Sequence, residues 1–240
     1  MTTATALTDA AYPVAASAPH PMVVLVRPRP HLPRRTVLAH ALKRTIDVVV
    51  ASAVLVMSIP VLLLAVLAIS LTSRGTPIFV QERVGKDGRH FRFYKLRTMV
   101  RGNDQTVQVA WASQWVRGGG FHGLYKLVDD DRVTTVGRFL RRYSIDELPQ
   151  MWNVIRGDMS LVGPRPALPH EVALYDDTAR QRLVVKPGVT GLWQVSGRSE
   201  LSFPEMIALD LHYAMWWSLR SDLRILARTP IAAISARGAA

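Results

Sequence analysis

The chain has 240 residues, no cysteine and a formal net charge of +12, with 30 Lys and Arg against 18 Asp and Glu. Its hydrophobic content of 49% excludes a wholly disordered chain, and the lack of cysteine excludes a disulfide scaffold, a thiolate zinc site and a cysteine nucleophile. The positive charge calls for an anionic partner, which is a nucleic acid, an acidic lipid or a phosphorylated substrate.

Residues 1–40 differ in composition from the rest of the chain. They are rich in alanine and threonine, carry several prolines between Pro13 and Pro33, and show no persistent apolar period. We therefore predict a flexible, basic arm over residues 1–40 and one folded domain over residues 41–240.

The stretch from Val48 to Ser73 contains no charged residue. As a helix rising about 1.5 Å per residue it is roughly 39 Å long, which exceeds the roughly 30 Å hydrocarbon core of a bilayer. We predict a membrane-inserted helix over residues 46–73. The alternative is a helix buried in the core of a soluble protein.

Pro60 lies in the middle of this stretch and follows Ser58, so the helix is expected to kink. Both flanks are basic, with Lys43 and Arg44 before the stretch and Arg74 among the residues after it. One straight span cannot keep both basic flanks in the cytoplasm, whereas a kinked helix that enters and leaves by the same face can. A re-entrant helix hairpin and an ordinary single span both remain open at this point.

Residues 75–240 form the predicted catalytic part, with an α+β, mainly helical fold. Segments 78–84 and 90–99 alternate apolar and polar residues around a glycine-containing turn, which predicts a β-hairpin. Residues 101–128 show no regular pattern. We predict helices over residues 133–142, 144–155, 171–183, 202–217 and 221–235, the last of them broken at Pro230.

The adjacent carboxylates Asp146 and Glu147 are the leading catalytic candidates. Ser144 followed by Glu147 matches a capping box, which places Asp146 in the first turn of a helix. The helix dipole keeps a carboxylate ionised there and attracts phosphate, and Arg141 just before it adds a cation. The alternative is that these residues only cap the helix.

Two further segments carry candidate phosphate ligands. Arg165 stands between two prolines after Gly163, which predicts a stiff turn that fixes one guanidinium for bidentate phosphate recognition. The glycine-containing segment 186–198, which ends in Arg198, is predicted as a loop whose backbone approaches a nucleotide. The alternatives are a rigid connector for the first segment and a surface turn for the second.

The C-terminal segment has features of a membrane-interface helix. Ser202 and Glu205 form a second capping box, and the helix that follows ends in Trp216 and Trp217. Arginines then recur every four residues from Arg220 over a leucine face, which is typical of a helix lying in the interface plane. The alternative is a surface helix packed on the core.

Together these motifs resemble the bacterial sugar transferase family, the monotopic polyprenyl-phosphate phosphoglycosyl transferases in their short catalytic form. The resemblance covers about residues 42–239 and rests on the order of its motifs rather than on any one of them. The motifs are Lys43-Arg44, Gln81–Gly85, Phe93–Met99, Asp131–Thr134, Ser144–Gln150, Asn153–Pro166 and Lys186–Arg198.

The resemblance implies transfer of a sugar 1-phosphate from a UDP-sugar to undecaprenyl phosphate with release of UMP, as the first step of exopolysaccharide or other surface-glycan synthesis. It implies a re-entrant helix kinked at Ser58 and Pro60, Mg²⁺ as cofactor held by Asp146 and Glu147, and a covalent phosphosugar on Asp146. Phosphate and nucleotide contacts are expected from Lys95, Arg141, Arg165 and Arg198, and membrane or lipid contacts from Lys43, Arg44, Trp216 and Trp217.

The segment from Gly191 resembles members that transfer a plain hexose phosphate, so glucose or galactose is expected. The resemblance also implies the cytoplasmic face of the bacterial inner membrane, membrane lipids as partners, and no nucleic acid; a homodimer is a further hypothesis. Two competing readings remain: a membrane-tethered basic module that binds nucleic acid or lipid, and a catalytically inactive scaffold of the same family.

Overall fold

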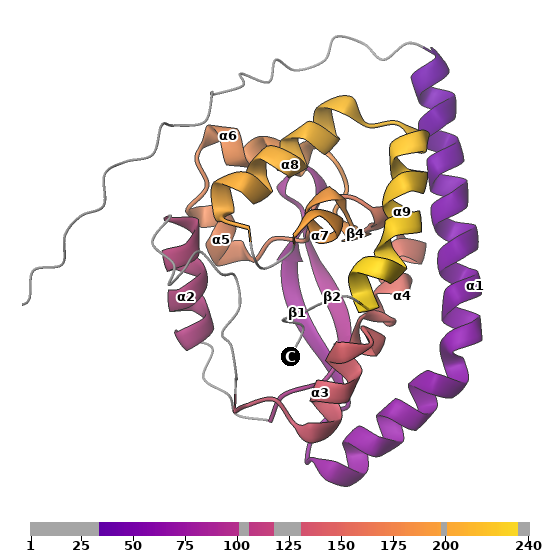
Figure 1. Ribbon diagram of the computed structural model, residues 1–240, viewed down its shortest axis with the longest axis vertical. Helices are drawn as coiled ribbons and strands as arrows, with labels where there is room; N and C mark the ends of the chain where they lie inside the picture. The colour runs from indigo at the N-terminus through magenta and orange to yellow at the C-terminus, as the bar shows by residue number, and fades with distance from the viewer. Residues whose placement is uncertain (1–33, 101–105, 118–130, 198–200, 235–240) are drawn as a thin grey trace, which may run out of the picture.

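The computed structural model describes residues 34–100, 106–117, 131–197 and 201–234. One long helix, α1 (Arg34–Thr72), runs along one side of a domain made of short helices and two small sheets, and then bends beneath it (Figure 1). The chain is thus mostly helical with little strand, which confirms the predicted fold class in this coarse form.

Helix α1 starts earlier than the apolar stretch indicates. Residues 34–40, which we grouped with the arm, form its first turns, since Leu38, Ala39, Ala41 and Leu42 all favour helix. The rest of the predicted arm, residues 1–33, lies outside the described part of the chain.

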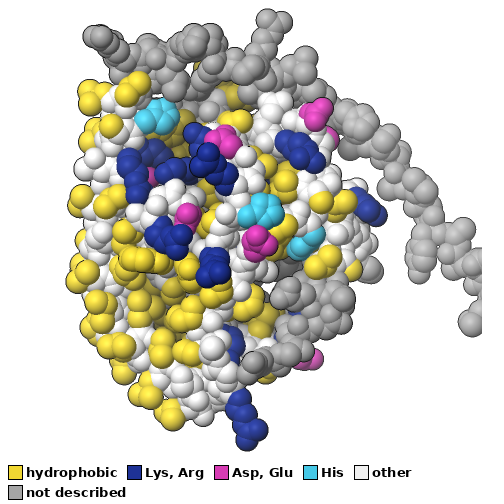
Figure 2. All heavy atoms as spheres, turned by 180° about the vertical axis from the view of Figure 1, so that it is seen from behind, with side chains coloured by type: hydrophobic (Ala, Val, Ile, Leu, Met, Phe, Trp, Pro, Cys, Tyr) yellow, Lys and Arg dark blue, Asp and Glu magenta, His cyan; other side chains and the backbone are white. Residues whose placement is uncertain are grey.

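The surface of α1 is apolar and exposed. Among the described helices, the segment Val37–Thr72 is the candidate membrane span; its most apolar window has a mean hydropathy of 2.8, and only 17% of that window is buried. Figure 2 shows hydrophobic side chains along the edge that α1 forms and over the lower part of that face. A core helix of a soluble protein would be mostly buried, so this exposure favours membrane insertion over the soluble alternative.

Pro60 lies inside α1, and the helix is bent in its second half (Figure 1). Proline cannot donate the backbone hydrogen bond of its position, and its ring crowds the preceding turn. Ser58 Oγ donates to the Leu55 carbonyl oxygen at 2.9 Å, a side-chain bond that also favours bending. The bend therefore coincides with the two residues, Ser58 and Pro60, at which the sequence predicts a kink.

The predicted hairpin is confirmed. Strands β1 (Ile78–Val84) and β2 (His90–Leu96) pair antiparallel, from Ile78 opposite Leu96 to Val84 opposite His90. The turn between them, η1 (Lys86–Gly88), places Asp87 and Gly88 at φ 56° and 77°, a left-handed region that aspartate and glycine tolerate.

A second sheet joins the segment just before the predicted Arg165 turn to a segment that we predicted as a loop. Strands β3 (Ser160–Val162) and β4 (Gly188–Thr190) pair in parallel, and the short helix α7 (Leu192–Ser196) follows β4. The loop prediction for residues 186–198 is therefore wrong over its described part. A Cβ on Gly188 would lie 2.1 Å from the Gly163 backbone nitrogen, so glycine here permits close strand contact rather than a loose turn.

The remaining helices correct several boundaries. Residues 106–116, predicted as irregular, form a helix, and the single helix predicted over 171–183 is three short ones because Asp176 caps a new start. The last helix continues through Pro230, which is exposed, instead of breaking there. The helices are α2 (Thr106–Val116), α3 (Thr135–Arg142), α4 (Gln150–Arg156), α5 (Pro169–Ala173), α6 (Asp177–Arg180), η4 (Gln181–Val184), α8 (Phe203–Trp216) and α9 (Leu219–Ile234).

Candidate active site

Asp146 and Glu147 lie in a 3₁₀ turn, η3 (Ile145–Glu147), rather than in the first turn of an α-helix. The predicted capping box is wrong: Ser144 has φ 54° and its side chain caps nothing. The α-helix starts later, after Pro149, because proline cannot donate the N–H that a helix continuing from Ser144 would need. The cap that was predicted at Ser202 is present, with Glu205 reaching back to the Ser202 N–H at 2.8 Å.

The two carboxylates differ in exposure. Asp146 is 7% exposed, whereas Glu147 is exposed on the surface of the turn. A buried carboxylate needs compensating polar or cationic neighbours to stay ionised. The structure brings such neighbours to Asp146.

Lys95 of β2 is one of those neighbours. Burial lowers its pKa to about 8; Asp146 opposes this effect, and the positive charges of Arg141 and Arg83 add to it. Its ammonium also lies 5.2 Å from the centroid of the Phe79 ring. Asp146 and Arg141 thus both lie close enough to Lys95 to act on its charge, and the catalytic roles of these residues stay a prediction.

Thr98 fixes Arg141 in this site. Arg141 Nε donates to Thr98 Oγ1 at 2.9 Å, and the Thr134 N–H donates to the Thr98 carbonyl oxygen at 3.0 Å. A Cβ on Gly137 would lie 2.1 Å from that same carbonyl oxygen, so α3 presses directly on the end of β2. This close packing sets the position of Arg141 relative to the Asp146 turn.

Arg165 belongs to a second group of buried charges. Its Nη1 lies 3.6 Å from Glu171 Oε2, and burial lowers its pKa to about 10 although Glu171 opposes the shift. The charge of Arg83 lowers the pKa of both Lys95 and Arg165, so Arg83 lies between the two groups. Its guanidinium stands 5.2 Å from the Phe93 ring centroid.

We call this second group the Arg165 cluster, and sequence reasoning missed most of it. Arg182 pairs with Asp210, each with a 1% exposed side chain. One signal was available, because Asp210 stands between Leu209 and Leu211 in an otherwise apolar stretch, where an isolated carboxylate indicates a buried partner. The members of the Arg165 cluster are Arg83, Arg165, Glu171, Arg182 and Asp210.

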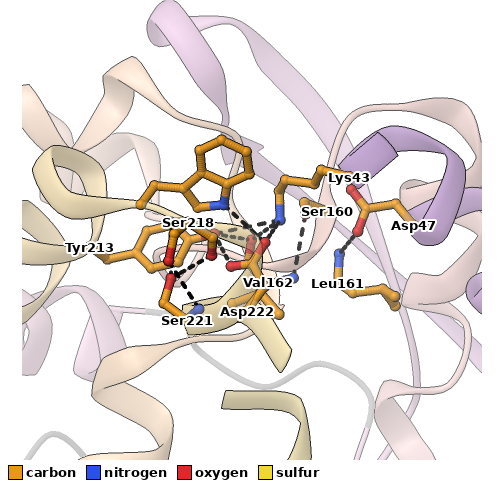
Figure 3. Close-up of polar contacts among 10 residues, drawn as sticks. Lys43, Asp47, Ser160, Leu161, Val162, Tyr213, Ser218, Ser221 and Asp222 are labelled. Carbon is orange, nitrogen blue, oxygen red and sulfur yellow. Dashed lines mark hydrogen bonds and ion pairs between the residues drawn. The ribbon is translucent and has the colours of Figure 1, made fainter. Parts of the chain in front are cut away.

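Lys43 and Arg44 make contacts inside the protein. Lys43 Nζ donates to Asp222 Oδ2 at 2.7 Å and to the Val162 carbonyl oxygen at 3.1 Å (Figure 3). Arg44 donates to two carbonyl oxygens at the end of α4, at 2.6 and 2.7 Å. Asp47 Oδ1 accepts from the Leu161 N–H at 3.0 Å, as Figure 3 also shows.

Lys43, Arg44, Asp47 and Asp222 therefore form what we call the α1 anchor, which ties α1 to the domain. Tyr213 donates to the same Asp222 carboxylate at 2.8 Å. The structure gives Lys43 and Arg44 this structural role, and lipid contacts of the two residues stay a prediction.

The remaining candidates separate by exposure. Trp216 is 70% exposed, as an interface residue would be, whereas Trp217 is half-buried and donates from Nε1 to Asp222 at 2.9 Å. Arg220 on α9 is exposed, as the predicted interface stripe requires. Arg198 lies outside the described residues, so its nucleotide contact stays a prediction.

Comparison with known proteins identifies the family. The family model described as bacterial sugar transferase matches residues 38–236. "Exopolysaccharide production protein ExoY" of Sinorhizobium fredii is 41% identical over 82% of this chain and 87% of its own length. "UDP-glucose:undecaprenyl-phosphate glucose-1-phosphate transferase" of Caulobacter vibrioides is 45% identical over 88% of this chain and 76% of its own length.

A third relative is longer. "UDP-galactose-lipid carrier transferase" of Erwinia amylovora is 41% identical over 78% of this chain, and the match spans only 39% of that protein. All of the described candidate site residues lie within residues 38–236, which the family model matches.

Proposed function

The chain belongs to the bacterial sugar transferase family, and on that premise we propose that it transfers a hexose 1-phosphate from a UDP-sugar to undecaprenyl phosphate and releases UMP. The names of its relatives, which include glucose and galactose transferases and an exopolysaccharide production protein, support this reaction class. The observation that carries the proposal is the buried Asp146 carboxylate, set beside Lys95 and Arg141 in a protein with an exposed apolar helix.

In the proposed reaction an Asp146 carboxylate oxygen attacks the β-phosphorus of the donor. A bond forms between that oxygen and phosphorus, the bond from phosphorus to the bridging oxygen breaks, and UMP leaves with the electron pair. A phosphate oxygen of undecaprenyl phosphate then attacks the same phosphorus and releases Asp146. Lys95 and Arg141 supply the positive charge that in-line phosphoryl transfer requires around its oxygens.

Magnesium fits this site only together with the substrate. Among the residues that the structure describes, no group of three or more acidic or histidine side chains gathers to hold an ion. Proteins commonly hold Mg²⁺ by one or two carboxylates plus substrate phosphates and water. Asp146 and Glu147 would provide the carboxylates, and the ion would neutralise charge on the donor diphosphate.

The contacts of α1 support a re-entrant helix on the cytoplasmic face. Arg97 donates to the carbonyl oxygens of Ser73 and Arg74, each at 2.9 Å, just after the helix ends. The α1 anchor holds the other end to the same domain. One domain cannot lie on both sides of a bilayer, so a helix tied to it at both ends must enter and leave by one face, and the basic flanks favour the cytoplasm.

The test is UMP release from a panel of UDP-sugars by detergent-solubilised protein with magnesium, with and without undecaprenyl phosphate. We expect lipid-dependent release from UDP-glucose or UDP-galactose, and a loss of at least about 10³-fold in Asp146→Asn because the nucleophile is removed. Asp87→Asn is the matched control, since Asp87 is exposed in the hairpin turn and asparagine tolerates its left-handed backbone.

Two outcomes overturn the proposal. Folded protein that releases no UMP from any UDP-sugar would favour the inactive scaffold. Release that Asp146→Asn leaves intact would remove Asp146 as the nucleophile. Chemical trapping of a radiolabelled phosphosugar on the wild-type chain in the absence of lipid would separate a covalent mechanism from direct transfer.

A further inference from the structure

The loop that carries Arg165 is fixed at each of its carbonyl groups. The four successive carbonyl oxygens from Pro164 to Ala167 all accept hydrogen bonds. The donors, in order, are the Gly188 N–H at 2.8 Å, Arg182 Nη2 at 2.9 Å, Arg83 Nη1 at 3.0 Å and the Val84 N–H at 2.9 Å. Buried arginines therefore hold this backbone at two of its four points.

Arg182 is itself held by buried partners. Its Nη1 donates to the Tyr175 hydroxyl at 2.8 Å, and its Nη2 also contacts the Asp210 carboxylate. These bonds come from two other elements, since Tyr175 follows α5 and Asp210 belongs to α8. The Arg165 carbonyl oxygen is thus held by an arginine whose own partners are buried in the domain.

Glu171 holds the other end of Arg165. Its Oε2 lies 3.6 Å from Arg165 Nη1 and accepts from the Leu168 N–H at 2.8 Å. Burial opposes ionisation of Glu171, but the charges of Arg165 and Arg83 outweigh burial and lower its pKa, so the group is a carboxylate at neutral pH. Its second oxygen, Oε1, is buried and has no hydrogen-bond partner among the described residues.

Cations outnumber carboxylates among the described members of the Arg165 cluster. It holds three arginines and two carboxylates, all of them poorly exposed. Buried positive charge attracts anions, and the donor diphosphate is such an anion.

We propose that Glu171 and Arg182 are positioning residues for Arg165: Arg182 fixes its backbone and Glu171 orients its guanidinium toward the donor phosphate. The inference rests on the proposed function, in which Arg165 contacts that phosphate. Neither residue touches substrate. Both act through Arg165, so their effect on catalysis must disappear when the Arg165 side chain is removed.

The test is a double-mutant cycle on the full chain, with kcat and KM measured for the UDP-sugar. Glu171→Gln keeps the size of the side chain and one acceptor for Leu168, and it should lower kcat/KM for the donor about tenfold, a coupling typical of two residues in contact. In an Arg165→Ala background the same change should have almost no further effect. KM for undecaprenyl phosphate should not change.

Glu205→Gln is the matched control. Glu205 accepts a bond of the same 2.8 Å length from the N–H of the residue that caps its helix, but it is exposed and forms no ion pair with an arginine that the structure describes, so its substitution should leave donor kinetics unchanged. Arg182→Lys keeps the positive charge beside Asp210 but removes the planar guanidinium. It can replace Glu171→Gln in the double-mutant cycle if the Glu171→Gln protein does not fold.

The outcomes distinguish the two proposals. Equal losses from Glu171→Gln with and without the Arg165 side chain would overturn the positioning role while leaving the function intact. An Arg165→Ala protein with wild-type kcat/KM would instead overturn the phosphate contact on which the inference rests. Full activity in both Glu171→Gln and Arg182→Lys would also overturn the inference.

Discussion

The α1 anchor and the Arg165 cluster are both groups of buried charges that hold backbone, and they differ in how their charges are matched. The α1 anchor has two cationic side chains and two carboxylates, and each carboxylate accepts hydrogen bonds from named donors. Among the described residues, the Arg165 cluster has three arginines and two carboxylates. Balanced charge suits a joint between a helix and a domain, whereas a group richer in cations suits the binding of an anionic substrate.

The largest expected effect comes from breaking the α1 anchor. Asp222→Ala leaves Lys43, Tyr213 and Trp217 without the carboxylate to which they donate. Removing one partner of a buried ion pair typically costs about 3–5 kcal/mol of folding free energy. We expect a large drop in the thermal unfolding temperature in detergent.

Asp177→Ala is the control for this prediction, because Asp177 is exposed on α6. A drop no larger than that of the control would show that the anchor carries little stability. Lys43→Met combined with Asp222→Leu should recover part of the loss, since apolar side chains of similar size remove the unpaired charge.

A steric change at Gly163 should have a smaller effect on stability and a clear one on the Arg165 cluster. An added Cβ would lie 2.3 Å from the Lys186 carbonyl oxygen, so Gly163→Ala must push the loop before Arg165 away from β4. Overpacking of this kind costs about 1–3 kcal/mol. We expect kcat/KM for the UDP-sugar to fall by a larger factor than the factor by which KM for undecaprenyl phosphate changes.

Gly85→Ala offers the comparison for that variant. Its Cβ would lie 3.2 Å from a carbon of the Phe91 ring, a side chain that can give way, so its effect on kinetics should be weaker. If both substitutions lowered kcat/KM equally, the close packing of Gly163 would not be what positions Arg165.

The smallest expected effect is a pH dependence carried by Lys95. Burial lowers its pKa to about 8, so in the free enzyme its charge is present below that pH and is lost above it. Donor kcat/KM, which reports groups of the free enzyme, should therefore fall as pH rises through about 8. Lys95→Arg should abolish this fall in kcat/KM above pH 8, because arginine stays charged.

Unfolding would not explain that loss. Between pH 8 and the ordinary lysine value of 10.5 the unfolded chain binds more protons at this position than the folded chain does, so this group makes folding more favourable as pH rises. A thermal unfolding temperature that fell in parallel with activity over this range would contradict the assignment to Lys95.

Local sequence signals predicted the elements that depend on neighbouring residues. The hairpin of β1 and β2 follows from alternation around a glycine turn, and the start of α8 follows from Ser202 and Glu205. The same capping pattern failed at Ser144, where Pro149 prevents an α-helix from continuing and a 3₁₀ turn forms. An identical spacing thus gave opposite outcomes because of one residue downstream.

Three of the predicted site residues come from separate segments of the chain. Asp146 and Arg141 both lie near enough to Lys95 to act on its charge. Glu171 and Arg182 could not be assigned, because nothing in their own neighbourhood shows that they meet Arg165. Only packing of α5, η4 and α8 against the loop brings their charges to it.

The sequence by itself determined that α1 is a long apolar helix kinked at Pro60, since length, hydropathy and the missing N–H are properties of consecutive residues. The tertiary structure decided that both ends of α1 are tied to one domain and that Arg165 lies beside the buried Glu171. Pairing of buried charges depends on which distant side chains share an interior of low polarity, and no local pattern encodes that choice.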